Sequence, residues 1–153
     1  MSDGSIPIGV RRPMRPLGIA ASGLTAQRAR IDAILSNIAN AETTRGVDGT
    51  PYRRKSVELQ EVSFQEAFEG ATETGGVEGF GGVRVAGVTE DPSDFILQYD
   101  PKHPDSDEDG YVLMPNVSIE DEMVDMMTAK RHFEANASVF EAIKSMLRRA
   151  AQL

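Results

Sequence analysis

The sequence predicts an α+β protein in which two long heptad helices, one near each end, flank a small β-rich insert. Three observations predict this fold: a heptad pattern near the amino terminus, a longer one at the carboxyl terminus, and short alternating apolar runs with many glycines and prolines between them. The expected boundaries are a flexible tail over residues 1–16, a helix over 17–42, a β-rich insert over 43–117 with a flexible loop over 69–82, and a helix over 118–153.

The first helix is predicted by apolar residues at every seventh position, namely Leu17, Leu24, Ile31 and Ile38. A companion series starts three positions further on and consists of Ala20, Gln27, Ile34 and Ala41. This spacing is typical of an amphipathic helix of about 24 residues that presents one apolar seam to a partner.

The second helix has the longer pattern, with Ile119, Met126, Phe133, Phe140 and Leu147 at intervals of seven. Its companion series is Glu122, Ala129, Asn136, Ile143 and Ala150. We expect Ser118 to cap this helix, because a serine hydroxyl accepts a hydrogen bond from a backbone N–H of the first turn. Acidic residues in the first turn and arginines in the last complement the helix dipole.

A single heptad helix cannot bury its own stripe, so the two helices need a partner surface. One arrangement packs them against each other as an antiparallel, coiled-coil-like hairpin that leaves apolar surface for neighbouring molecules. The other is a self-contained α+β monomer whose helices cover the sheet, and periodicity alone favours neither. Gln27 and Asn136 are polar residues in the companion series, and such residues can fix the register of packed helices.

The insert contains four candidate strands, each bounded by turn-forming residues. They are the runs 55–62, 82–90, 95–99 and 111–114.

Composition excludes several classes of function. The net charge of −8 argues against nucleic-acid binding, which needs clustered Lys and Arg. No apolar run approaches the ~20 residues of a membrane-spanning helix, so we expect no membrane insertion. Arg11, Arg12 and Arg15 offer limited attraction to an anionic membrane surface. The chain contains no cysteine, and its start is too short and broken in its apolar part for a cleavable secretory signal.

One stretch matches a metal-binding pattern in part. Asp105–Gly110, "DSDEDG", reproduces the opening of a calcium-binding EF-hand loop, which would make the chain a calcium-binding or other non-catalytic interaction module. The twelfth position is Asn116 instead of the bidentate glutamate, and Pro115 precedes it. An acidic turn between strands is therefore the favoured interpretation. The rest of the sequence shows no nucleophile paired with a base and no cofactor motif. We therefore expect neither an enzyme nor a bound cofactor.

The end of the first helix carries two amides three residues apart, in the stretch "SNIANAETTRG" over 36–46. Asn37 and Asn40 can bond the last carbonyls of the helix, and asparagine tolerates the left-handed turn that ends one.

Several segments resemble one family, that of the bacterial flagellar rod proteins. The signature consists of a heptad helix followed by Asn-x-x-Asn-x-x-Thr, carried here by Ser22, Gly23, Asn37, Asn40, Thr43 and Gly46. The runs 46–59, 81–117 and 122–146 add to the resemblance, which covers nearly all of residues 17–150.

The resemblance implies a structural subunit of the proximal rod in the flagellar basal body, serving motility. Such a subunit polymerises with itself and other flagellar rod proteins, and meets the hook-basal-body junction protein at the rod base. It passes unfolded through the flagellar type III export apparatus without a cleaved signal, and lies in the rod where it crosses the periplasm. On this interpretation the helices over 17–42 and 118–153 are assembly helices, and the two series Leu17 to Ile38 and Ile119 to Leu147 form the assembly interface. Asn37 and Asn40 then mark a hinge between the first of them and the insert.

Overall fold

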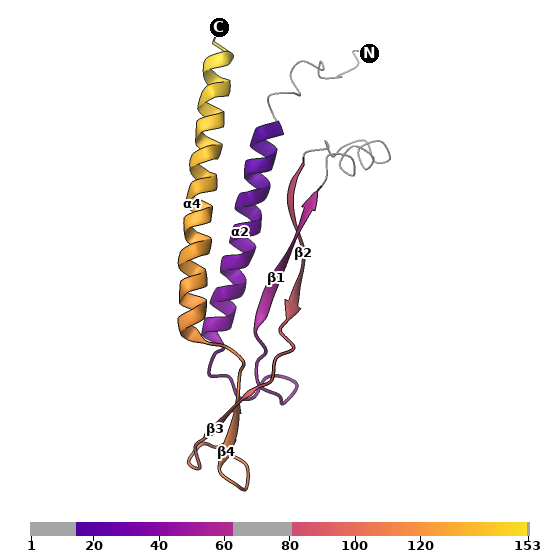
Figure 1. Cartoon of the computed structure of the whole chain (residues 1–153), viewed down its shortest axis with the longest axis vertical. Helices are drawn as coiled ribbons and strands as arrows, with labels where there is room; N and C mark the ends of the chain where they lie inside the picture. The colour runs from indigo at the N-terminus through magenta and orange to yellow at the C-terminus, as the bar shows by residue number, and fades with distance from the viewer. Residues whose placement is uncertain (1–14, 63–80, 153) are drawn as a thin grey trace, which may run out of the picture. The chain divides into compact units, whose positions relative to one another are not determined.

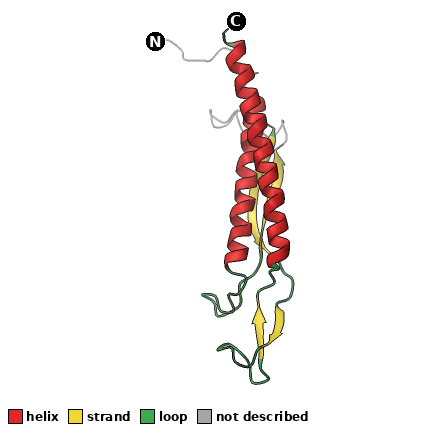
Figure 2. Cartoon of the chain, turned by 90° about the vertical axis from the view of Figure 1, so that its left-hand side faces the viewer, coloured by secondary structure: helices red, strands yellow, loops and turns green. Residues whose placement is uncertain are grey.

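The computed structural model describes residues 15–62 and 81–152 of the chain (Figure 1). The elements in chain order are α2 (Arg15–Ala39), β1 (Lys55–Val62), β2 (Gly82–Glu90), β3 (Ile96–Tyr99), β4 (Tyr111–Met114) and α4 (Ile119–Ala150). The α+β class is confirmed, with a small insert of two two-stranded sheets, β1–β2 and β3–β4 (Figure 2). Three of the four strands have the predicted bounds, and the third begins one residue later, at Ile96.

The chain divides into two compact units. Unit 1 consists of Met1–Arg28, Leu59–Val85 and Arg131–Leu153, and unit 2 consists of Ala29–Glu58 and Ala86–Lys130. Each helix and each strand of the β1–β2 pair therefore contributes residues to both units, whereas β3 and β4 belong to unit 2 alone.

The bounds of α2 differ slightly from the expected helix. It begins at Arg15, with Pro16 in the first turn, where a missing N–H and a fixed φ are tolerated because the first N–H groups have no acceptor within the helix. Residues 1–14 of the predicted tail and 69–80 of the predicted loop lie outside the described residues. Gly82, the last residue of the predicted loop, is the first residue of β2.

The start of α4 follows the predicted capping pattern. The Ser118 hydroxyl accepts a hydrogen bond of 3.3 Å from the backbone N–H of Asp121, which is the arrangement of an N-cap. Three acidic residues occupy the first turn, and Arg148 and Arg149 occupy the last. Both charged groups stabilise the helix through its dipole.

β3 and β4 form an antiparallel hairpin in unit 2, in which Leu97 pairs with Leu113 and Tyr99 with Tyr111. The loop between the strands ends at Gly110, whose φ of 83° lies in the left-handed region. A Cβ at this position would also lie 3.0 Å from the Tyr99 ring, so glycine is required there for two reasons.

The buried apolar residues are few, and in unit 1 they are small. In unit 1 the described ones are Ala20 and Ala26; in unit 2 they are Ile34, Ala41, Val112, Pro115, Val117 and Ala129. Because alanine removes little apolar area from water, the described part of unit 1 gains little hydrophobic stabilisation from its own core.

Candidate functional site: the Asn37 junction and the assembly surface

The side chain of Asn37 is fully buried in unit 2 and makes four hydrogen bonds. Its Nδ2 donates to the backbone carbonyl of Lys55 at 2.8 Å and to Oε2 of Glu122 at 3.1 Å. Its Oδ1 accepts from the backbone N–H of Lys55 at 2.8 Å and from the Tyr52 hydroxyl at 3.0 Å. These bonds use both donors and both lone pairs of the amide, so residue 37 joins the end of α2 to the start of β1 and the first turn of α4.

Glu122 is the second fully buried polar side chain of this cluster. Its Oε1 accepts a charge-assisted hydrogen bond of 2.6 Å from Nε of Arg54, which opposes the cost of burying the carboxylate. The same guanidinium reaches Asp125 at 3.5 Å, and Asp125 also pairs with Arg30 at 3.5 Å. We call Asn37, Tyr52, Arg54, Lys55 and Glu122 the Asn37 junction.

Asn40 and Thr43 shape the turn after α2. Nδ2 of Asn40 donates to the carbonyl of Ser36 at 2.8 Å, so the prediction that this residue bonds a last-turn carbonyl is confirmed. The Thr43 hydroxyl donates to Oδ1 of Asn40 at 3.3 Å, and the Thr43 carbonyl accepts from the N–H of Tyr52 at 3.0 Å. The turn therefore leads the chain back toward Asn37.

Two parts of the expectation for the asparagines are wrong. Asn37 does not bond the carbonyls of its own helix, because its amide is used by Lys55, Glu122 and Tyr52. Neither asparagine adopts a left-handed conformation, since within residues 15–62 and 81–152 only glycines have positive φ. The helix instead ends through the backbone N–H of Asn40, which bonds the carbonyls of Ser36 and Asn37 at 3.1 and 3.2 Å.

The remaining motif residues have local roles in the backbone. Ser22 in unit 1 donates to the carbonyl of Ile19 at 2.7 Å and accepts from the N–H of Val83 at 3.2 Å, which holds the start of β2 against α2. Gly46 in unit 2 donates its N–H to the carbonyl of Thr50 at 2.8 Å, closing a small loop.

Gly23 allows a close approach between two segments of unit 1. A Cβ at this position would lie 2.9 Å from Nδ2 of Asn136, a distance that real Cβ contacts do not show. The predicted motif residue and the predicted register residue are therefore brought together.

Gln27 and Asn136, the two predicted register residues, line one groove of about 480 Å³ in unit 1. Its apolar lining includes Ile19, Leu59, Val83, Val139 and Ile143. Oε1 of Gln27 is buried and receives no hydrogen bond from any described residue. A buried acceptor without a donor is costly, so this oxygen lowers the stability of unit 1.

The two predicted seams are half-buried in the single chain. All nine residues keep part of their surface accessible: Leu17, Leu24, Ile31, Ile38, Ile119, Met126, Phe133, Phe140 and Leu147. The fully covered positions belong mainly to the companion series, namely Ala20, Ile34, Ala41, Glu122 and Ala129. The seam residues thus retain apolar surface that contact with another molecule could cover.

The acidic loop of the partial EF-hand pattern forms a turn. Asp105 accepts from the Thr44 hydroxyl at 2.8 Å and pairs with Arg45 at 3.0 Å. Oδ1 of Asp107 accepts the N–H groups of Asp109 and Tyr111 at 3.0 and 2.7 Å, as in an Asx turn. Within the part of the chain that the structure describes, no three potential metal ligands gather at one point. The geometry supports the acidic turn.

Sequence reasoning missed the Asn37 junction. The available signal was Glu122, an acidic residue in the otherwise mostly apolar companion series, since a charge at such a position needs a buried partner. The partner, Arg54, lies 68 positions away in sequence, and no local pattern connects the two.

Comparison with known proteins gives a consistent result. Residues 17–45 match the family described as flagella basal body rod protein, and residues 108–153 match the family described as flagellar basal body rod FlgEFG protein C-terminal. The flagellar basal-body rod protein FlgC of Bacillus subtilis is 46% identical over 143 residues, which cover 90% of this chain and 95% of that protein. The chain belongs to the FlgC family of flagellar basal-body rod proteins.

Other FlgC proteins match over similar lengths. The one from Borreliella burgdorferi is 46% identical over 88% of this chain and 92% of its own length. The one from Salmonella typhimurium is 42% identical over 84% of this chain and 88% of its own length. Membership in the FlgC family makes the chain a structural subunit of the bacterial flagellar basal-body rod and not an enzyme. In the described segments, neither helix is long and apolar enough to cross a membrane.

Proposed function

We propose that this rod subunit polymerises with itself and with other flagellar rod proteins through its terminal helices. The observation that carries the proposal is the half-buried state of both predicted seams. Covering a large apolar side chain completely stabilises an assembly by about 1.5–3 kcal/mol relative to leaving it exposed. The nine seam residues are already partly covered, so each contributes only a fraction of this value, and their sum favours association.

The small core of unit 1 supports the same proposal. The apolar residues buried among its described parts are alanines, while Ile19 and Val139 are about half exposed. The groove lined by Gln27 and Asn136 offers a concave, largely apolar surface to a neighbouring subunit. Contact with a neighbour would complete this unit.

We further propose that α2 and α4 pair as an antiparallel, coiled-coil-like hairpin. Two contacts within unit 2 support this direction. Asn37 bonds Glu122, and Arg30, which lies earlier in α2, pairs with Asp125, which lies later in α4. In unit 1 the close approach of Gly23 and Asn136 supports small-residue packing between helices. Gln27 and Asn136 would set the register of this packing.

The proposed domain organisation is one assembly helix near each end, α2 and α4, with the β-rich insert between them. Asn37 and Asn40 lie where the first assembly helix meets the insert.

The wider setting is proposed from family membership. Neighbours would include the hook-basal-body junction protein at the rod base, and the subunit would reach its place across the periplasm through the flagellar type III export apparatus without a cleaved signal. Basal bodies purified from motile cells would then contain this chain.

A pair of adjacent substitutions tests the assembly role of the seam. Leu147 is a seam residue, whereas its neighbour Met146 lies off the seam and is 57% exposed. We expect Leu147→Ser to reduce the amount of the subunit in purified basal bodies about tenfold, the effect of ~1.4 kcal/mol, and Met146→Ser to leave it close to wild type. Circular dichroism of both full-length variants checks that they fold alike. Equal losses for the two variants would contradict a seam-specific interface.

A further inference from the structure

The β3–β4 hairpin of unit 2 exposes four large apolar side chains on one face. The register places Leu97 opposite Leu113 and Tyr99 opposite Tyr111, and alternation along each strand directs all four to the same side. Their exposed fractions are 65%, 47%, 65% and 44% in that order. The two tyrosine rings meet edge to face with centroids 5.3 Å apart. We call these four residues the hairpin face.

On the opposite side of the hairpin Val112 packs within unit 2 and is only 2% exposed, whereas Ile96 is 51% exposed. A lone two-stranded hairpin is marginally stable in water, and packing against another surface stabilises it. Contiguous apolar surface of this kind marks an interaction site.

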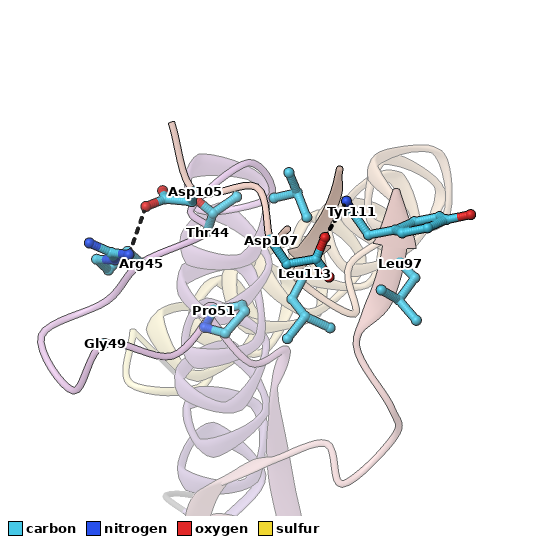
Figure 3. Close-up of a pocket in the computed structure, with 10 residues that line it drawn as sticks. Thr44, Arg45, Gly49, Pro51, Leu97, Asp105, Asp107, Tyr111 and Leu113 are labelled. Carbon is cyan, nitrogen blue, oxygen red and sulfur yellow. Dashed lines mark hydrogen bonds and ion pairs between the residues drawn. The ribbon is translucent and has the colours of Figure 1, made fainter. Parts of the chain in front are cut away.

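A hollow of about 170 Å³ adjoins the hairpin face (Figure 3). Leu97, Tyr111 and Leu113 line it together with Pro51. The ion pair between Arg45 and Asp105 belongs to its lining and makes part of it polar. The size of the hollow is close to the ~150 Å³ of an apolar cavity that takes up benzene. One large apolar side chain of a partner would therefore fit.

The surroundings of the hairpin face are acidic. Residues 94–110 contain six acidic residues and one lysine, and among the acidic ones Asp107, Glu108 and Asp109 are exposed. The partner segment should therefore combine apolar side chains with positive charge.

The chain itself contains one segment with this composition. Residues 6–15, "IPIGVRRPMR", hold three arginines, no acidic residue, and the apolar side chains Ile6, Ile8, Val10 and Met14. Residues 4–31 as a whole contain five arginines and no acidic residue, in a chain of net charge −8. The two regions of strongest opposite charge are thus the amino-terminal segment and the hairpin.

We propose that the hairpin face binds residues 6–15 of a second copy of this chain. An apolar side chain of that segment enters the hollow beside Leu97 and Leu113, and its arginines lie against the exposed acidic residues of the loop. The contact is head-to-tail, so it leaves one hairpin face and one amino-terminal segment available for further copies. This inference rests on the proposed polymerisation and adds a second interface, separate from the helical seams.

Cross-linking between two full-length chains tests the proposal. Because the native chain has no cysteine, only the introduced cysteines can react. A size-tagged Val10→Cys chain is mixed with an untagged Leu97→Cys chain and treated with a short bismaleimide, and the mixed adduct is identified by its mass. The matched control is Gln98→Cys, whose side chain points to the other side of the same strand. We expect about tenfold more mixed adduct for Leu97→Cys than for Gln98→Cys, equivalent to ~1.4 kcal/mol.

Charge reversal tests the acidic side of the contact. Arg11→Glu with Arg12→Glu in the tagged chain should lower the yield of adduct, and Glu108→Lys with Asp109→Lys in the untagged chain should restore it. High salt should lower the yield from the Val10→Cys and Leu97→Cys chains without charge reversal, because 1 M salt shortens the screening length to about 3 Å. Equal yields at positions 97 and 98, or no rescue by the reversed pair, would overturn the proposal. A chain carrying both Val10→Cys and Leu97→Cys that cross-links only within itself would also overturn it.

The two interfaces can fail separately. The hairpin inference is wrong, and the helical seam stands, if two results are found together. The first is that the Leu97→Ser, Leu113→Ser chain enters basal bodies at the wild-type level. The second is that the Val10→Cys and Leu97→Cys chains do not cross-link. If Leu147→Ser is excluded from basal bodies and copies still cross-link through Val10→Cys and Leu97→Cys, both proposals are supported.

Discussion

Asn37 and Glu122 lie 85 positions apart in sequence, are both completely buried, and share a hydrogen bond of 3.1 Å in unit 2. Each also bonds a residue of the segment that leads into β1: Asn37 bonds Lys55, and Glu122 bonds Arg54. Three segments are therefore held by one polar cluster where a core of apolar side chains would be usual. Because buried polar groups tolerate few arrangements, this cluster specifies how the segments meet.

Asn37→Ala should destabilise the protein strongly. The substitution leaves the N–H and C=O of Lys55 and one carboxylate oxygen of Glu122 without their partner, and each unsatisfied buried group costs about 1–3 kcal/mol. We expect the free energy of unfolding in urea to fall by about 3 kcal/mol or more.

Asn40→Ala is the matched control for this substitution. Asn40 donates one hydrogen bond to the Ser36 carbonyl and accepts one from Thr43 in a half-buried turn, so we expect a loss of about 1 kcal/mol. If both substitutions cost the same, Asn37 does not have the central role that its four hydrogen bonds indicate.

The pair formed by Arg54 and Glu122 should show strong coupling in a double-mutant cycle. Removing one partner leaves the other charge buried or poorly compensated, so Arg54→Met and Glu122→Gln should each cost about 2–4 kcal/mol. The double variant should cost less than the sum, with a coupling energy of about 1–3 kcal/mol.

An exposed ion pair on α4 provides the comparison for this cycle. Lys144 and Glu141 are 3.6 Å apart, with side chains 50% and 69% exposed, and the expected coupling energy is below about 0.5 kcal/mol. Urea unfolding of the two sets of variants measures both values. Similar coupling energies in the two pairs would show that the burial of Glu122 does not strengthen its interaction with Arg54.

The sequence predicted the elements well and their polar contacts poorly. Heptad spacing and capping residues are local signals, so the bounds of α4 and of three strands could be predicted closely. The bond between Arg54 and Glu122 joins residues 68 positions apart, and no periodicity specifies which buried carboxylate meets which guanidinium.

The candidate assembly surface shows the same division. Periodicity identified Leu17 and Phe140 as members of apolar stripes. It could not show that most buried positions belong to the companion series, while these two residues are only half-buried. That outcome depends on side-chain size: alanine at positions 20 and 129 allows close approach, which the larger seam residues do not.

Gly23→Ala tests the close approach of two segments in unit 1. Alanine is favoured over glycine in a helix by about 1 kcal/mol, so without the contact the substitution should stabilise the protein. With a new Cβ 2.9 Å from Nδ2 of Asn136, that side chain has to shift, and we expect the gain in the free energy of unfolding to be lost.

The second substitution Asn136→Ala removes the clash and should recover stability in the Gly23→Ala background. Thermal unfolding of the two single variants and the double variant measures this coupling. A stabilisation by the full ~1 kcal/mol for Gly23→Ala alone would show that the segments do not pack this closely.

Asp91 should give stability a dependence on acid pH. The Ser93 hydroxyl, followed by the Ser93 backbone N–H, bonds its carboxylate and holds the pKa of Asp91 below its ordinary value of 3.8; the guanidiniums of Arg54 and Arg53 add to this effect, which outweighs desolvation. Because the pKa is lower in the folded protein, this contribution to stability is fully present above the unfolded value of about 3.9 and is lost as the pH falls through the folded value.

Ser93→Ala removes the largest of these causes. We expect the variant to melt below wild type by a constant interval from pH 7 down to about pH 5, and the interval to shrink as the pH falls below 3.8 and Asp91 becomes protonated. Ser138→Ala is the control, because that hydroxyl bonds the backbone carbonyl of Glu134 and no carboxylate. Its interval should stay constant from pH 7 to about pH 2.5, well below the ordinary pKa of Asp. An interval for Ser93→Ala that is equally constant would show that the Ser93 hydroxyl does not favour the ionised form of Asp91.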